Sequence, residues 1–79
     1  MKEMCLSKDS DVALFLKYAS MLEEIGAYFT EKITGPDQRY WDFLFANEQF
    51  TLHQEHYLGI SIMSEKELPD SFTSLTEEK

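Results

Sequence analysis

The segment His53-Gln54-Glu55-His56 holds two imidazoles and a carboxylate, which are groups that bind metals and transfer protons. On a helix, side chains three positions apart share a face, so the two histidines would be placed to share a metal ion. The surrounding residues instead predict the end of a strand, where positions three apart point to opposite faces. The spacing indicates no third ligand, so we expect polar residues at a hairpin end and no bound metal.

A second group with chemical potential is Asp42 with His53, because the predicted sheet brings them close together on one face. An aspartate beside a histidine is the supporting half of a nucleophilic triad, and Ser61 or Thr51 would have to supply the nucleophile. The sequence has no Gly-x-Ser-x-Gly elbow and no glycine-rich loop for an oxyanion hole. We therefore predict a protein that is not an enzyme and uses no cofactor. A small enzyme or metal-binding domain centred on His53, His56 and Asp42 is the alternative.

Trp41, with Tyr40 and Tyr57, has the ring chemistry of a platform on which nucleic-acid bases stack. Such platforms lie in basic grooves, and Arg39 is the only basic residue near these rings in the sequence. We therefore expect Trp41 to be a core residue beneath a helix.

The charge of the chain narrows the choice of partners. Fifteen acidic residues against seven basic ones give a formal net charge of −8. Nucleic acids and anionic membrane surfaces bind through lysine and arginine, so we expect neither as a partner. The charge predicts plain solubility or an acidic face that docks onto a basic protein.

The sequence contains no apolar run long enough for a signal peptide or a membrane span, so we expect a cytoplasmic location. Cys5 is the only cysteine, which excludes an intramolecular disulfide and a disulfide-rich scaffold.

One amphipathic helix is predicted from about residue 10 to 26, with Asp9 or Ser10 at its start and Gly26 at its end. Apolar side chains fill half of its circumference, which is the width needed by a helix that lies across a sheet. The residues expected to face the sheet are Leu14, Phe15, Tyr18, Leu22 and Ile25.

From residue 28 the apolar period changes towards 2, which predicts strands. Residues 28–33 either form a first strand or continue the helix. With Asn47-Glu48 as the next turn, Phe45 faces Phe50 and Phe43 faces Leu52, and a loop at residues 55–57 puts Ile60 opposite Leu52. The predicted apolar face then comprises Trp41, Phe43, Phe45, Phe50, Leu52, Ile60 and Ile62.

These patterns predict an α+β fold, with one N-terminal amphipathic helix packed on an antiparallel meander of three or four strands. Residues 1–8 are expected to be a flexible leader and residues 9–68 the single domain. Residues 69–79 are expected to be a short helix or a frayed tail.

We expect a small acidic binding factor, such as a regulator, an inhibitor or an immunity-like protein. An oligomeric accessory subunit is a further alternative. Its partner would be a basic protein, or a second copy joined at a sheet edge. The predicted partner surface comprises Asp42, Leu44, Thr51, His53, Ser61, Met63, Glu65 and Glu67. In length, acidity and architecture the chain resembles small bacterial proteins that include immunity and antitoxin proteins, a likeness of composition that covers no motif.

Overall fold

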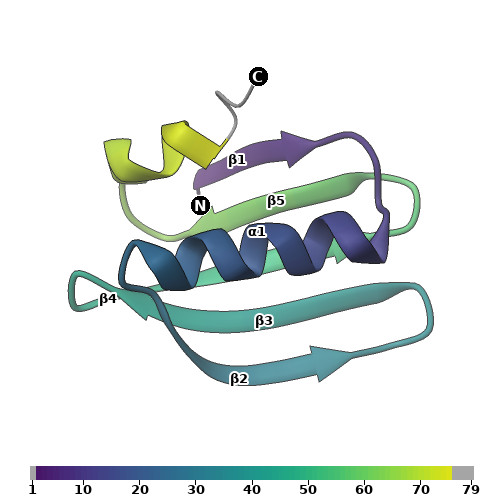
Figure 1. Ribbon diagram of the computed structural model, residues 1–79, viewed down its shortest axis with the longest axis horizontal. Coiled ribbons are helices and arrows are strands. Elements are labelled where there is room, and N and C mark those ends of the chain that lie inside the picture. Colours follow the sequence, from purple (N-terminus) through teal and green to yellow (C-terminus); the bar gives the residue numbers. More distant parts are fainter. Residues whose placement is uncertain (1, 76–79) are drawn as a thin grey trace.

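The computed structural model describes residues 2–75, apart from the side chain of residue 74. Five strands form one antiparallel sheet, and helix α1 lies across one of its faces (Figure 1). The elements in chain order are β1 (Lys2–Ser7), α1 (Val12–Glu24), β2 (Tyr28–Thr34), β3 (Gln38–Phe45), β4 (Glu48–Glu55), β5 (Gly59–Ser64) and the 3-10 helix η1 (Asp70–Leu75). The α+β class is therefore confirmed, with five strands in place of the three or four expected. Residues 28–34 form a strand and do not continue the helix.

The N-cap of helix α1 is Asp11, one residue after Ser10 and two after Asp9, and its carboxylate accepts a hydrogen bond from the Ala13 amide at 3.3 Å. At the other end, the amides of Gly26 and Ala27 donate back to the carbonyls of Glu23 and Leu22. This pair of bonds is a Schellman motif, and Gly26 adopts the positive φ of 112° that it requires.

Ile25 does not join the core, contrary to our prediction. It follows the last helical residue, and 38% of its surface is exposed. The reversal of the chain at Gly26 therefore carries Ile25 away from the sheet.

The strand order is β1-β5-β4-β3-β2, so the two outer strands are those that flank the helix in sequence. The prediction that residues 1–8 form a flexible leader is wrong for residues 2–7, which pair with β5 and place Met4 opposite Ile62. Leu6 is buried, and its carbonyl accepts a 3.1 Å hydrogen bond from the Tyr18 hydroxyl on α1. Sheet pairing and helix packing together therefore fix the first strand.

Both hairpin registers differ from the prediction by two residues, in opposite directions. The β3–β4 turn is Ala46-Asn47, each with a positive φ, so Phe43 faces Phe50 and Trp41 faces Leu52. Moving a two-residue turn by one position moves the register by two, which leaves every side chain on its predicted face. The β4–β5 turn lies one residue later than predicted, so Leu52 faces Ile62, and here too each side chain keeps its predicted face.

The core lies between the sheet and the layer made by α1 and η1. Its fully buried side chains come from α1, β3, β4, β5 and η1: Phe15, Leu22, Phe43, Phe50, Leu52, Ile60, Ile62, Phe72 and Leu75. Trp41 and Phe45 are only partly buried, contrary to expectation, and both lie on β3. Trp41 meets Phe15 edge to face at 4.9 Å, and the Lys32 ammonium lies 4.6 Å from the centre of its ring.

Residues 70–75 adopt a short helix, which was one of the two forms predicted for the C-terminal segment. Residues 76–79 lie outside the described residues. No helix within residues 2–75 is long and apolar enough to cross a membrane.

Candidate partner-binding face

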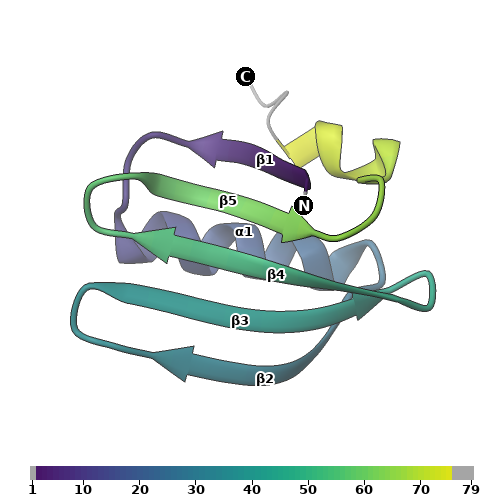
Figure 2. The ribbon, with the colours of Figure 1, turned by 180° about the vertical axis from the view of Figure 1, so that it is seen from behind.

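Within residues 2–75, no helix covers the face of the sheet opposite α1 (Figure 2). We call it the open face, and it is formed by the strand residues that alternate with those of the core. Six residues of the predicted partner surface belong to it: Asp42, Leu44, Thr51, His53, Ser61 and Met63. The alternation of side chains therefore places them together as expected.

Acidic side chains dominate the charge of the open face. The register places Glu3, Glu31, Asp42 and Glu55 on it, one from each of four strands. In the described part of the chain, no strand position on this face is a lysine or an arginine. The face is therefore more uniformly acidic than the chain as a whole.

His53 lies at the centre of the open face and is nevertheless only 8% exposed. The ring of its cross-strand partner Tyr40 stacks on it, with centroids 4.5 Å apart and an angle of 17° between the planes. Its Nε2 is 3.5 Å from Oε1 of Glu55, yet it makes no hydrogen bond to any residue that the structure describes. The Tyr40 hydroxyl donates to Oε1 of Gln38 at 2.8 Å, which helps to hold the stacked ring in place.

The predicted nucleophiles are engaged with carboxylates. The Thr51 hydroxyl donates to Oδ1 of Asp42 at 2.8 Å, and the Ser61 hydroxyl donates to Oε2 of Glu3 at 3.0 Å. Asp42 is directly opposite Thr51, which leaves it diagonal to His53. These residues therefore do not form a catalytic triad, in which a hydroxyl, an imidazole and a carboxylate are hydrogen-bonded in series.

His56 lies in the exposed turn between β4 and β5, away from the stacked His53, and packs edge-on against Tyr57. Its carbonyl accepts a hydrogen bond from the Ser10 hydroxyl at 2.9 Å. Buried Gln54 donates from its side chain to the Ser10 carbonyl at 2.6 Å, which ties this hairpin to the chain before α1. Within residues 2–75, no three His, Cys, Asp or Glu side chains gather closely enough to hold a metal ion.

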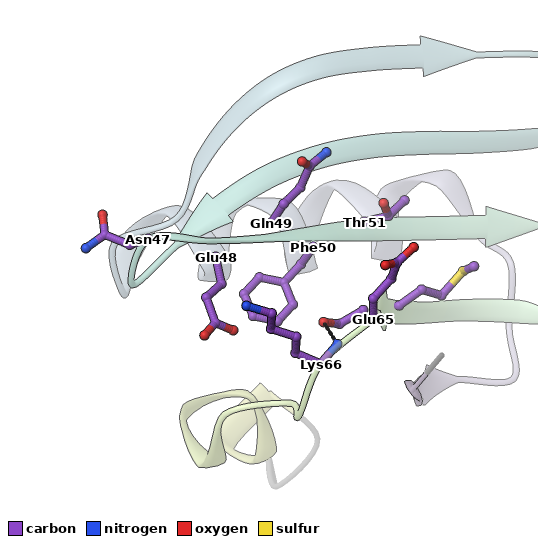
Figure 3. Close-up of a pocket in the computed structure, with 9 residues that line it drawn as sticks. Asn47, Glu48, Gln49, Phe50, Thr51, Glu65 and Lys66 are labelled. Atoms are coloured by element: carbon purple, nitrogen blue, oxygen red, sulfur yellow. Dashed lines mark hydrogen bonds between the residues drawn. The ribbon is translucent and has the colours of Figure 1, made fainter.

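A cavity of about 510 Å³ opens at one end of the sheet, where the chain leaves β5 while β4 continues towards its turn (Figure 3). We call it the notch. It is lined by Asn47, Glu48, Gln49, Phe50, Thr51, Met63, Ser64, Glu65 and Lys66. Glu65 from the predicted partner surface belongs to it, whereas Glu67 lies further along and pairs with Lys2 at 3.7 Å.

Four of the open-face residues described above, Tyr40, Glu55, Glu3 and Glu31, were not part of the predicted partner surface. Tyr40 and Glu55 have the same strand parity as Asp42 and His53, so the alternation alone was enough to include them. Glu3 was not recoverable in this way, because its strand was not predicted. Glu31 follows a bulge in β2 that reverses the alternation, and the sequence carries no signal for that bulge.

No protein-family model matches this chain, and neither the search of curated proteins nor that of solved structures gave a significant match.

Proposed function

We propose that the protein is a non-enzymatic binding factor, a regulator or an inhibitor, that docks its open face onto a basic protein. The observation that carries the proposal is the charge of that face. Four strands each contribute a carboxylate to it, and no lysine or arginine lies among its described strand positions.

Charge complementarity of this kind mainly raises the rate of association and determines which partners bind. A surface of one sign speeds association with a partner of the opposite sign and repels partners of the same sign. Nucleic acids and anionic membranes fall in the repelled class, because the chain carries a net charge of −8. The same repulsion disfavours two copies of the chain meeting through their open faces.

The open face also supplies apolar contact area, which a stable complex needs in its centre. Leu44 on β3 is 41% exposed. Tyr40 on the same strand and Met63 on β5 are each partly exposed. The stacked Tyr40 and His53 rings are held in position before any partner arrives, so little side-chain freedom is lost there on binding.

The test begins with a partner identified by affinity capture and then measures its association rate with the purified protein. We expect the rate to fall as salt rises, because exposed charges are screened beyond about 8–10 Å at physiological ionic strength. Glu31→Lys should slow association several-fold more than the matched change Glu23→Lys on α1, which lies on the opposite side of the sheet. A rate that is independent of salt and equal in the two variants would reject docking through the open face.

A further inference from the structure

We propose that the notch captures a short extended segment of the partner and holds one of its lysine or arginine side chains. This inference rests on the proposed function, because it assigns an anchoring position to a basic partner at one end of the acidic sheet.

The first argument comes from the backbone of β4. In a two-residue hairpin, the residues that flank the turn exchange both backbone hydrogen bonds, so Glu48 directs its N–H and C=O towards β3. The next residue, Gln49, then directs its N–H and C=O away from β3, towards the notch. Pairing of β4 with β5 stops at Thr51 and Met63, so within the described chain Gln49 has no strand partner on that side.

An unpaired N–H and C=O on the same side of one residue form the unit to which an extended peptide adds as a strand. The notch is the place where the sheet has room for such a segment, because the chain after β5 diverges from β4 (Figure 3). A peptide backbone is therefore the ligand that this edge is suited to bind.

The second argument comes from the side chains around that edge. Met63 is partly exposed and supplies apolar surface on which the methylene stem of a long basic side chain can lie, whereas Phe50 is buried and forms the floor of the notch. Glu48 and Glu65 are both exposed and stand on opposite sides of the cavity, where each can pair with a cationic group. Lys66 also lines the notch, so one resident ammonium opposes two carboxylates and the lining keeps a net negative charge.

The experiment titrates the isotope-labelled full-length protein with a short capped peptide of alternating valine and arginine, followed by amide chemical shifts. We expect the shifts to centre on residues 48–51 and 63–66. The double variant Glu48→Gln/Glu65→Gln should weaken the affinity about five- to tenfold, whereas Glu23→Gln/Glu24→Gln, which removes the same charge from α1, should weaken it about twofold or less.

A second peptide tests the backbone pairing. Methylating every backbone nitrogen of the probe keeps its side chains and charge but removes its capacity to donate to the Gln49 carbonyl. We expect at least about a tenfold loss of affinity, since that hydrogen bond is lost and the methyl groups, which project from the pairing edge, also hold the peptide carbonyl away from the Gln49 amide. Unchanged affinity would overturn strand addition at the notch.

The outcomes separate this inference from the proposed function. Shifts centred on Asp42 and Glu55, with equal losses in both double variants, would overturn the notch as the anchor and leave docking through the open face standing. Shifts confined to Glu23 and Glu24, or no shifts at all, would overturn both.

Discussion

Gly59, the first residue of β5, is the position at which a single methyl group should damage the fold most specifically. It is buried and has a φ of +99°, which side chains other than glycine rarely adopt. A Cβ atom there would overlap the carbonyl oxygen of Ser7 and lie 2.9 Å from Cα of Lys8. Both of these are backbone atoms, one in the last residue of β1 and one in the residue after it, so they cannot move aside without moving the chain there.

The magnitude of Gly59→Ala follows from two separate costs. Holding alanine in the left-handed region costs about 1–2 kcal/mol. Forcing an extra carbon into a packed site costs about 1–3 kcal/mol, and the overlap with backbone places this variant at the upper end. A domain of this length has a free energy of unfolding of about 4–12 kcal/mol, so a loss of about 3–5 kcal/mol removes between a quarter and all of it.

The other two glycines provide matched controls. Gly26 has a φ of +112°, but the atom nearest to an added Cβ is Cε1 of Phe45 at 3.8 Å, so Gly26→Ala should lose only the about 1–2 kcal/mol of backbone strain. At Gly35 an added Cβ would lie 3.4 Å from the Gln38 carbonyl oxygen, which predicts a change within about 1 kcal/mol.

Urea unfolding followed by Trp41 fluorescence and far-ultraviolet circular dichroism measures all three variants in one assay. Amide exchange adds a local readout, because a displaced β1 should exchange faster in Gly59→Ala than in Gly26→Ala. Equal destabilisation of Gly59→Ala and Gly26→Ala, with β1 equally protected, would refute the close approach of β1 to the start of β5.

Three further changes test the core, the hairpin anchor and the histidines. Phe43→Ala should lower the free energy of unfolding by about 3–5 kcal/mol, because this side chain is fully buried in the core, and an unchanged urea midpoint would contradict that packing. Gln54→Leu should cost about 1–3 kcal/mol, measured in the same way, because it leaves the Ser10 carbonyl without its 2.6 Å donor; a neutral result would show that water replaces the bond. Added zinc or a chelator should leave the melting temperature unchanged, since His53 is stacked on the sheet and His56 lies in a turn, and a rise of several degrees with stoichiometric zinc would reject this reading.

Local pattern was sufficient to predict the two faces of the sheet. Alternating apolar residues over β3, β4 and β5 separate a core side from an open side, and any error of two in the register preserves that separation. The exact turn was harder to predict, because Ala46 carries no signal for the positive φ of 54° that it adopts. The open-face residues of β3, β4 and β5 were predictable for the same reason as the core, since they are the intervening residues, whereas Glu3 and Glu31 were not.

The sequence by itself determined the amphipathic helix, the acidic charge and which side chains of the central strands point together. Only the tertiary structure decided that residues 2–7 form a strand, because β1 has just Met4 and Leu6 as large apolar residues and its partner β5 lies at the far end of the chain. The tertiary structure also decided that β4 extends beyond the end of its pairing with β5, which creates the notch. The position of this cavity depends on where the two paired strands separate. The period of the apolar residues shows which side chains of one segment face the core. Strand order and strand ends instead depend on contacts between segments that are distant in sequence.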